Sequence, residues 1–415
     1  MKLLCLSNGH GEDAIALRVL KALQQKSQDL KQPLELAALP IVGDGYAYQA
    51  ADIPLAGPTQ VMPSGGFVYM DGAQLWRDVR GGLLTLTRAQ IQVARRWGRA
   101  GGSILAVGDI VPLLFAWASG ASYAFIGTAK SEYYLRDESG PLAHRAWFDQ
   151  IEGWTGSVYL PWERWLMSRP RCRSVFPRDR LTAEFLKQWP IPAVDLGNPM
   201  MDGLRVEPDY ADSLANAPPQ SILLLPGSRS PEAERNWQML LAAADSVRQI
   251  WGSARFLAAI SPNLDQAIFD RQAVQQGWRP AGRAQSSGQT YTSGEAALDI
   301  DARFYDFLHQ ADAAIAMAGT ATEQFVGLGK PVIALPGEGP QFTPAFAEAQ
   351  TRLLGPSAQL VTAPAEAGKA LQRLWADVPR RQAIARSGQR RLGPPGAAER
   401  IAAHLLSVMA SPSPP

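Results

Sequence analysis

Two glycine turns, each between an apolar segment and a helix-like segment, constrain the fold of this chain more than any other feature. The first, Leu-Pro-Gly-Ser-Arg at 225–229, follows strand-like residues 221–224, and the second, Gly-Thr-Ala-Thr-Glu-Gln at 319–324, follows strand-like residues 313–317. A strand, a tight turn and a helix in succession are typical of parallel α/β sheets, in which ligands bind beyond the carboxyl ends of the strands. Each turn would direct backbone N–H groups and the positive end of a helix dipole toward that edge. We therefore expect an anionic group, such as a nucleotide diphosphate, to bind there.

The same alternation continues through both halves of the chain. Strand-like segments are expected at 2–7, 34–42, 103–107, 123–127, 172–176 and 194–196, and then at 222–225, 256–260, 314–317 and 332–335. With helix-like patterns between several of them, this order predicts an α/β fold with doubly wound parallel sheets. Because a chain of 415 residues exceeds what one core usually holds, we expect two Rossmann-like domains whose carboxyl edges face each other across a cleft.

Domain boundaries follow from composition and periodicity. We place an amino-terminal domain at 1–206, a carboxyl-terminal domain at 207–390, and a last helix with a disordered tail at 391–415, where the helix could cross back to the first domain. The linker is expected at 207–220, because prolines bracket a polar stretch there. A stretch rich in Ser, Gly, Gln and Thr at 281–295 is typical of an exposed loop.

Composition and charge exclude several classes of function. The chain is 46% hydrophobic and 19% charged, which fits a well-filled core and argues against disorder. Its net charge of +2, without a dense basic stripe, gives no sign of nucleic-acid binding. Cys5, Cys172 and the four histidines do not occur at the spacings of disulfide frameworks or metal sites, so we expect neither a metal nor another cofactor.

The sequence favours a cytoplasmic location. The apolar start, residues 1–7, is too short for a signal peptide. The most apolar stretch, 104–117, is interrupted by Gly108, Asp109 and Pro112, so it cannot form a membrane-spanning helix. Any membrane contact would therefore be peripheral, on the cytoplasmic face.

Several motifs resemble those of lipid-A-disaccharide synthase, a family of inverting glycosyltransferases. They are the turn at 225–229, Ala-Gly-Thr-Ala-Thr at 318–322, Gly-Lys-Pro-Val at 329–332 and Leu-Gly-Asn-Pro-Met-Met-Asp at 196–202. The chain looks most like a branch related to this family in cyanobacteria, whose openings are similar to Ser-Asn-Gly-His-Gly-Glu-Asp at 7–13. The resemblance covers most of the chain in order. It implies the GT-B fold, with two Rossmann-like domains, and hexosyl transfer from a nucleotide sugar without a metal ion.

For the donor, the resemblance implies a site at the two glycine turns. Arg229 would bring positive charge to the diphosphate, although an ion pair with Glu232 or Glu234 is the alternative. Gln324 stands where the family has a glutamate, and its amide could still hydrogen-bond a ribose. We expect a UDP-linked sugar. The residues assigned to donor binding are Gly227, Ser228, Arg229, Gly319, Thr320, Ala321, Thr322 and Gln324.

Two residues compete for the role of the base that takes the proton of the acceptor hydroxyl. Asp109 follows the strand at 103–107, and a partly desolvated carboxylate there could act as a base or could cap the next helix. His10 lies in a glycine turn and has a suitable ordinary pKa, although a lone histidine is often structural. The family's acceptor motif is represented only by Gly-Asp-Ile-Val-Pro at 108–112, so the acceptor is open. Other acceptor-side candidates, any of which could belong to an ordinary loop or helix start, are Gly9, Gly11, Glu12, Lys130 and Glu132.

Two regions suggest contact with a lipid. Residues 58–99 begin with an apolar, glycine-rich and aromatic stretch, which could be a lid, a membrane-facing edge or a surface loop before an ordinary helix. The second region is rich in tryptophan and arginine, a composition suited to a membrane interface but also to packing at a domain edge. It contains Trp147, Trp154, Trp162, Trp165, Arg164, Arg169, Arg171 and Arg173.

The expected function is sugar transfer from a nucleotide donor to a lipid-linked or membrane-associated acceptor. A nucleotide-sugar epimerase would share the fold and the diphosphate site, and it is the first alternative. A non-catalytic protein that binds a nucleotide sugar is the second.

Overall fold

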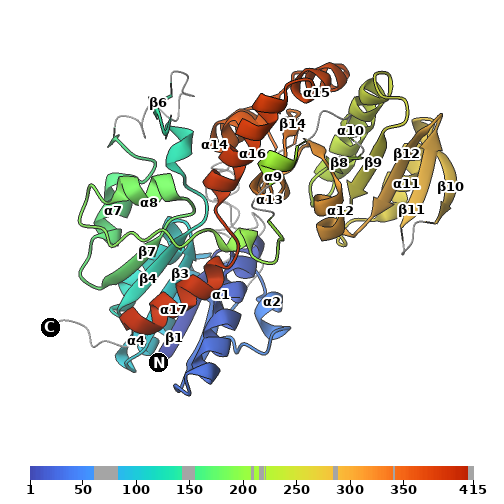
Figure 1. Cartoon of the computed structure of the whole chain (residues 1–415). Coiled ribbons are helices and arrows are strands. Elements are labelled where there is room, and N and C mark those ends of the chain that lie inside the picture. The colour runs from blue at the N-terminus through green and yellow to red at the C-terminus, as the bar shows by residue number, and fades with distance from the viewer. Residues whose placement is uncertain are drawn as a thin grey trace. The chain divides into compact units, whose positions relative to one another are not determined.

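The computed structural model describes residues 1–59, 83–142, 155–206, 210–214, 219, 221–283, 288–339 and 342–409. Trp147, Trp154, most of the expected linker and residues 60–82 of the expected lid or loop at 58–99 lie outside these ranges. The chain divides into two compact units, one formed by Met1–Asp202 and Pro395–Pro415 and the other by Gly203–Pro394 (Figure 1).

Unit 1 is built on a five-stranded parallel sheet in the order β2-β1-β3-β4-β7. The strands are β1 (Lys2–Ser7), β2 (Glu35–Pro40), β3 (Ser103–Gly108), β4 (Tyr123–Gly127) and β7 (Cys172–Phe176). The strand expected at 194–196 does not form. Ala193 makes only an isolated bridge to Val175, and the chain then turns at Gly197, whose φ is +83° and whose amide donates to the Asp195 carboxylate at 3.2 Å.

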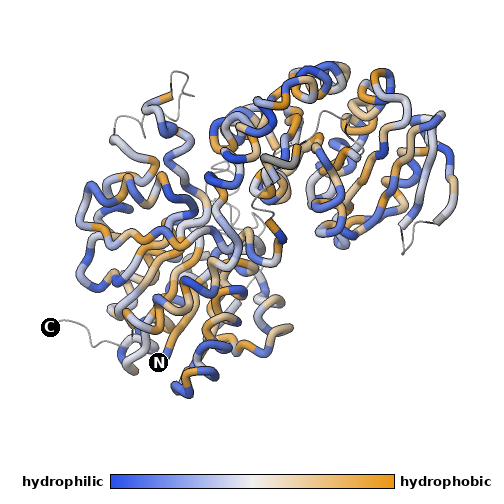
Figure 2. Tube along the Cα trace, in the orientation of Figure 1, coloured by the Kyte–Doolittle hydropathy of each residue, from blue (hydrophilic) through white to orange (hydrophobic). Residues whose placement is uncertain are grey.

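Helices cover both faces of this sheet, because alternate side chains of each strand point to opposite faces. On β1, Leu3 and Cys5 pack against α1 (His10–Asp29) and α17 (Ala397–Met409). Leu4 and Leu6 belong to the core on the other face, which α4 (Leu83–Arg99), α5 (Ile110–Ser119) and α7 (Pro161–Met167) cover. Figure 1 shows α17 beside α1, and Figure 2 shows the strands as mostly hydrophobic. The smaller elements of this unit are α2 (Tyr46–Gln49), α8 (Arg180–Leu186), β5 (Arg136–Asp137), β6 (Gly140–Pro141) and two 3-10 turns, η1 (Glu132–Tyr134) and η2 (Pro199–Met201).

Asp202 fastens the last helix to unit 1. Its Oδ1 accepts hydrogen bonds from the amides of Gly396 and Ala397 at 2.6 and 2.8 Å, and its Oδ2 accepts one from Ala398 at 2.7 Å. A carboxylate at the start of a helix satisfies amides that have no partner inside the helix and interacts favourably with the helix dipole. Asp202, at the end of the first segment of unit 1, thus holds the start of α17, which belongs to the second segment of this unit.

Unit 2 contains an eight-stranded sheet in the order β10-β11-β12-β9-β8-β13-β14-β15. Its strands are β8 (Ser221–Leu225), β9 (Arg255–Ala259), β10 (Arg279–Arg283), β11 (Gln289–Ser293), β12 (Ala296–Asp301), β13 (Ala313–Ala316), β14 (Val332–Ala334) and β15 (Ala358–Leu360). The sheet is parallel from β12 to β15, whereas β10 and β11 are antiparallel additions at one edge. The expectation of an exposed loop at 281–295 is therefore wrong for most of this segment, which contains the end of β10 and the whole of β11. Tyr291 explains the difference, because its side chain is buried in the core of this unit.

The helices of unit 2 pack around a core that contains Trp237, Phe256 and Trp278. They are α9 (Tyr210–Ser213), α10 (Glu232–Arg248), α11 (Gln266–Gln275), α12 (Phe304–Gln310), α13 (Thr320–Gly327), α14 (Pro344–Leu354), α15 (Ala367–Trp375) and α16 (Val378–Leu392), with 3-10 turns η3 (Gly355–Ser357) and η4 (Pro364–Glu366).

Candidate functional site

The two glycine turns lie side by side at the carboxyl edge of the unit 2 sheet. They follow β8 and β13, which are parallel neighbours with Leu225 paired to Ala316. The amide of Met317 donates to the carbonyl of Leu225 at 2.9 Å. Gly227 has a φ of +101°, and a Cβ atom added there would lie 3.6 Å from the carbonyl oxygen of Met317. The first turn therefore needs glycine for its backbone conformation, which is strained for other residues.

Asn236, a residue that the sequence did not single out, holds both turns. It lies on α10 with 2% of its surface exposed, and its Nδ2 donates to the carbonyls of Pro226 at 3.0 Å and Met317 at 3.5 Å. A buried amide that bridges two carbonyls satisfies groups that would otherwise lose their water without a partner. The sequence does contain a sign of this role, because Asn236 is a polar residue beside Ala233 and Trp237 on the apolar face of the helix.

The start of α13 supplies the backbone donors of the second turn. In the described part of unit 2, the amides of Thr320 and Ala321 donate to no backbone acceptor, whereas those of Thr322 and Glu323 donate to the Gly319 carbonyl at 3.0 and 3.2 Å. The Thr322 hydroxyl is buried and donates to the carbonyl of Ala318 at 2.6 Å. We therefore assign the side chain of Thr322 to the turn itself rather than to a ligand.

Gln350 and Gln324 lie close to this turn in different ways. Nε2 of Gln350, on α14, donates to the carbonyls of Ala318 and Gly319 at 3.1 and 3.2 Å. Gln324 is only 6% exposed, and its neighbour Glu323 is 8% exposed. Little of the Gln324 amide is thus open to a ribose, and that contact stays a prediction.

A third turn, after β14, approaches the first two. The Glu232 carboxylate, at the start of α10, accepts a hydrogen bond from the amide of Phe342 at 2.7 Å, and a Cβ atom on Gly339 would overlap that carboxyl group. Next to this turn, Phe346 exposes 40% of its surface and stacks edge-on against Phe342 at 5.4 Å. Its Cζ atom would lie 3.7 Å from a Cβ atom on Gly319. An exposed aromatic ring therefore borders the glycine turn at the start of α13.

In unit 1, the acceptor-side candidate Glu12 lies close to Asp109 at the carboxyl edge of β1, β3 and β4. The hydroxyl of Thr128, which follows β4, donates to the Glu12 carboxylate at 3.3 Å, and the Thr128 amide donates to the Gly108 carbonyl at 3.1 Å. A Cβ atom on Gly108 would lie 3.3 Å from both Asn8 and Glu12. Asp109 is thus placed beside the first turn of α1.

Asp109 fills one of the two roles that its sequence position suggested, that of a helix cap, and its role as a base stays a prediction. Its Oδ1 caps α5 by accepting a hydrogen bond from the amide of Val111 at 2.9 Å. Burial raises the pKa of this carboxyl group, and the nearby negative charge of Glu163 raises it further, against the opposing effects of the Val111 hydrogen bond and of Lys130. A carboxylate that holds its charge less readily accepts a proton more readily, as base catalysis requires.

The glycines around His10 differ in their surroundings. Gly9 is buried with a φ of +139°, whereas a Cβ atom on Gly11 would meet nothing within 4 Å. The backbone of His10 begins α1, and its side chain lies outside what the structure describes. The choice of His10 as a base therefore stays a prediction.

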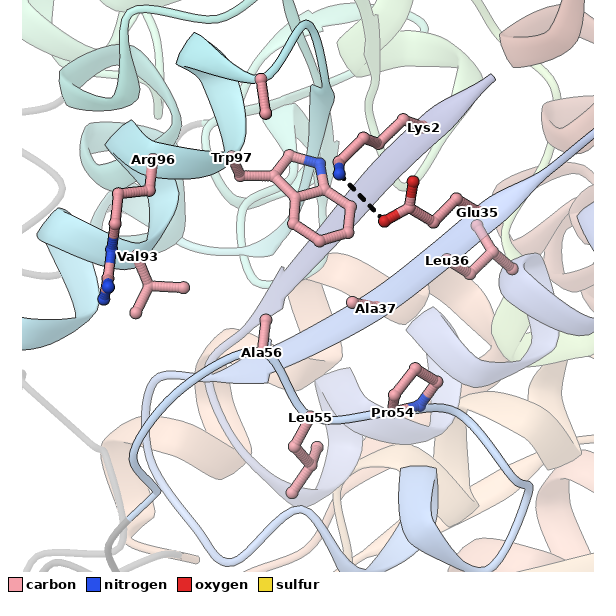
Figure 3. A pocket seen from close by; sticks show the side chains of 11 residues that line it. Lys2, Glu35, Leu36, Ala37, Pro54, Leu55, Ala56, Val93, Arg96 and Trp97 are labelled. Atoms are coloured by element: carbon pink, nitrogen blue, oxygen red, sulfur yellow. Dashed lines mark ion pairs between the residues drawn. The ribbon is translucent and has the colours of Figure 1, made fainter.

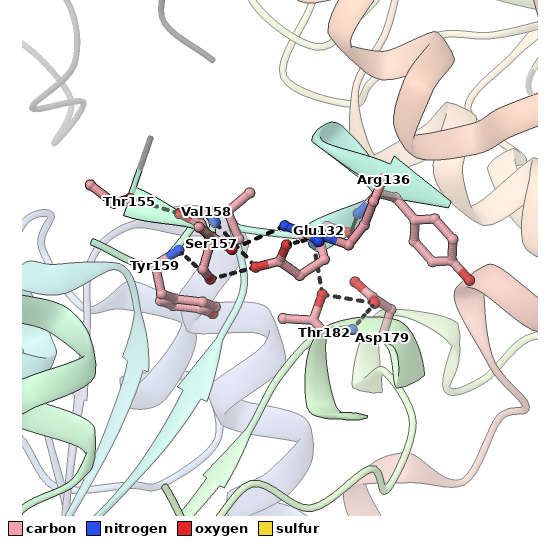
Figure 4. A network of polar contacts seen from close by, with 11 residues as sticks. Glu132, Arg136, Thr155, Ser157, Val158, Tyr159, Asp179 and Thr182 are labelled. Atoms are coloured by element: carbon pink, nitrogen blue, oxygen red, sulfur yellow. Dashed lines mark hydrogen bonds and ion pairs between the residues drawn. The ribbon is translucent and has the colours of Figure 1, made fainter. Parts of the chain in front are cut away.

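Glu132 belongs to a buried polar network (Figure 4), and both Glu132 and Lys130 hydrogen-bond the backbone of Val158. Glu132 is fully buried, its Oε1 accepts hydrogen bonds from the Ser157 hydroxyl and the Val158 amide, and its Oε2 pairs with Arg136 at 2.8 Å. Lys130 pairs with Glu163 at 2.7 Å and donates to the Val158 carbonyl at 2.8 Å. This corrects the assignment of Glu132 to the acceptor, because both of its oxygens are engaged inside the protein. Its hydrogen bonds and ion pair explain why a charged residue can be buried there.

Replacement of Glu132 by alanine should lower the free energy of unfolding by about 3 kcal/mol, because it leaves the Arg136 charge and two buried donors without their acceptor. Glu184→Ala is the matched control, since Glu184 also pairs with an arginine four residues away, Arg180, but both side chains are exposed. Urea unfolding checks the difference, and equal losses in the two variants would contradict this role of Glu132.

A cavity of about 530 Å³ lies at the opposite edge of the unit 1 sheet, where β1 and β2 begin. Figure 3 shows the Trp97 indole beside the ion pair of Lys2 and Glu35, whose charged atoms are 2.9 Å apart. None of the residues assigned to the donor or the acceptor lines this cavity. In the described ranges, no three His, Cys, Asp or Glu side chains gather as metal ligands do, and no helix is both long and apolar enough to cross a membrane.

No protein-family model and no curated protein sequence matches this chain. Its structure is similar to that of CalG4, the calicheamicin glycosyltransferase, with a TM-score of 0.59, 13% identity and coverage of 100% of this chain and 99% of that one. It is also similar to MurG from Acinetobacter baumannii, with a TM-score of 0.56, 14% identity and coverage of 98% of this chain and 99% of that one. A third similar structure is that of a UDP-GlcNAc 2-epimerase from Neisseria meningitidis, bound to UDP-GlcNAc. Its TM-score is 0.53 and its identity 14%, with coverage of 98% of this chain and 100% of that one. These similarities extend over nearly the whole chain and show that it has the GT-B fold.

Proposed function

We propose that the protein is an inverting glycosyltransferase that uses a UDP-linked sugar. The observation that carries the proposal is the pair of adjacent turns after β8 and β13, which Asn236 holds together at the carboxyl edge of unit 2. Ligands of doubly wound folds bind at this edge. The amides at the start of α13 and the guanidinium of Arg229 are groups that favour an anionic diphosphate.

In the proposed reaction, an acceptor hydroxyl oxygen attacks the anomeric carbon of the sugar as the bond to the diphosphate oxygen breaks. The carboxylate of Asp109 takes the hydroxyl proton, with His10 as the other candidate. The electron pair of the broken bond leaves with the diphosphate, whose added negative charge Arg229 and the start of α13 stabilise. In this proposal, side chains and backbone amides of the chain perform the proton transfer and stabilise the leaving diphosphate, without a metal ion.

The proposed acceptor is a lipid-linked or membrane-associated molecule. The motif resemblance to the lipid-A-disaccharide synthase-related branch supports this choice. The incomplete match at 108–112, where the family's second acid is missing, suggests an acceptor different from that of lipid A synthesis.

Epimerisation of a UDP-sugar is the second candidate, because solved UDP-GlcNAc 2-epimerases share the fold over nearly the whole chain. The two reactions can be separated by incubating the protein with UDP-N-acetylglucosamine, with and without a membrane lipid extract, and following the sugar by NMR. Release of UDP together with a new glycolipid, seen only with the extract, is the expected result. An epimerised nucleotide sugar without any acceptor would overturn the transferase proposal, and binding without turnover in either mixture would favour a non-catalytic protein.

A further inference from the structure

Two neighbouring helices of unit 1 expose large apolar side chains. Trp162 and Trp165 on α7 are 55% and 45% exposed, and Leu114 on α5 is 44% exposed. The two helices are in contact, and α7 turns Leu166 and Met167 inward to the core. The outward side of this short helix therefore carries tryptophans where a water-exposed helix normally carries polar residues.

One of these tryptophans packs against a neighbouring tryptophan and lies next to an arginine. Trp165 stacks edge-on against Trp117 of α5 at 5.5 Å, and the guanidinium of Arg169 lies 4.3 Å from the centre of the Trp165 ring. Such a cation–π contact keeps a positive charge beside the apolar surface. Trp117, Trp165 and Arg169 thus form a continuous aromatic and basic surface.

Positive charge also gathers on this side of the sheet. The helix α4 contacts α5 and contains no acidic residue, and Arg95 joins the two by donating to the carbonyl of Ala118 at 3.0 Å. The helix α5 carries no charge, and the one acid of α7, Glu163, is buried and paired with Lys130. On the opposite face, α1 carries three acidic and three basic residues. The arginines that α4 exposes are Arg88, Arg95, Arg96 and Arg99.

We propose that the surface formed by α4, α5 and α7 binds an anionic lipid bilayer. Tryptophan is enriched at the membrane interface, where its ring lies among the head groups. Arginine side chains can extend from an apolar surface to lipid phosphates, and each basic residue near an anionic bilayer strengthens the attraction. The choice of a lipid rather than a soluble partner rests in part on the proposed acceptor, but vesicle binding requires no nucleotide, so the two proposals can fail separately.

Cosedimentation of the full chain with vesicles tests the proposal. Vesicles of mixed phosphatidylglycerol and phosphatidylcholine should bind the protein, vesicles of phosphatidylcholine alone should bind it far less, and high salt should release it. The double variant Trp162→Ala, Trp165→Ala should weaken the partition constant about tenfold or more. Trp162→Ala alone should weaken it in part, and it leaves the contact between Trp117 and Trp165 intact.

Tyr46→Ala is the matched control, since Tyr46 is 72% exposed on α2, which packs against α1 and so lies away from the proposed surface. This variant should bind vesicles as the unchanged protein does. The proposal is overturned if the unchanged protein ignores anionic vesicles, or if Tyr46→Ala loses as much binding as the double variant. It is also overturned if sedimentation velocity shows a dimer that the double variant converts to a monomer, because the surface would then bind a second copy.

Discussion

Asp109→Asn should lower kcat for sugar transfer by about 10²- to 10⁴-fold, the usual contribution of a general base. Asparagine keeps the side-chain oxygen that accepts a hydrogen bond from the Val111 amide, so the cap of α5 should survive. Steady-state kinetics measures kcat, and calorimetry should show unchanged affinity for UDP. If kcat is unchanged, Asp109 is not the base, and His10 takes its place in the mechanism.

The pH dependence gives Asp109 a second signature. Its pKa is raised in the folded protein, and only the ionised carboxylate can take a proton, so kcat should fall as the pH drops through this raised pKa. Asp109→Asn should remove that fall. A raised carboxyl pKa also means that the folded state binds the proton more tightly than the unfolded state, so ionised Asp109 lowers stability above this pKa. The variant should therefore be at least as stable as the unchanged protein at neutral pH, which separates loss of catalysis from loss of folding.

Arg229→Ala should raise the Kd for UDP by about 10- to 100-fold, because a hydrogen bond to a charged group contributes roughly 1.5 to 3 kcal/mol. Arg229→Lys should recover only part of the affinity, since an ammonium group lacks the planar fork of the guanidinium. Arg235, which is exposed in the first turn of α10, provides the control. Arg235→Ala should bind UDP as the unchanged protein does, and an equal loss in both alanine variants would show that general charge, rather than the turn, governs binding.

Most of the parallel strands could be predicted from the sequence because they are short, largely apolar runs. The parallel strands β12 and β15 were not predicted, since two acids and Gln359 break their apolar patterns. The strand β4 begins and ends at the predicted residues, and so does β7, although Arg173 and Ser174 interrupt the apolar pattern of β7. The antiparallel strand β11 could not be predicted in this way, because its polar composition resembles that of a loop. Tyr291 makes it a strand, by packing into a core contributed by distant segments.

The candidate site was predicted only in part, because its supports are tertiary contacts. The two turns could be predicted from their glycines and the apolar segments before them. Asn236, however, acts by joining Pro226 to Met317, and Met317 lies 81 residues after Asn236 along the chain. The role of Glu132 has the same origin. The sequence alone favours a surface position for Glu132, because its partners Ser157 and Arg136 are identified only in the folded structure.

Calorimetric titration of the protein with UDP, GDP, CDP and ADP tests whether the protein binds a nucleotide diphosphate, as the two glycine turns of unit 2 predict. We expect UDP to bind with a Kd below about 1 mM, the other nucleotides to bind more weakly, and Arg229→Ala to weaken UDP binding. Failure of all four nucleotides to bind the unchanged protein would contradict this prediction.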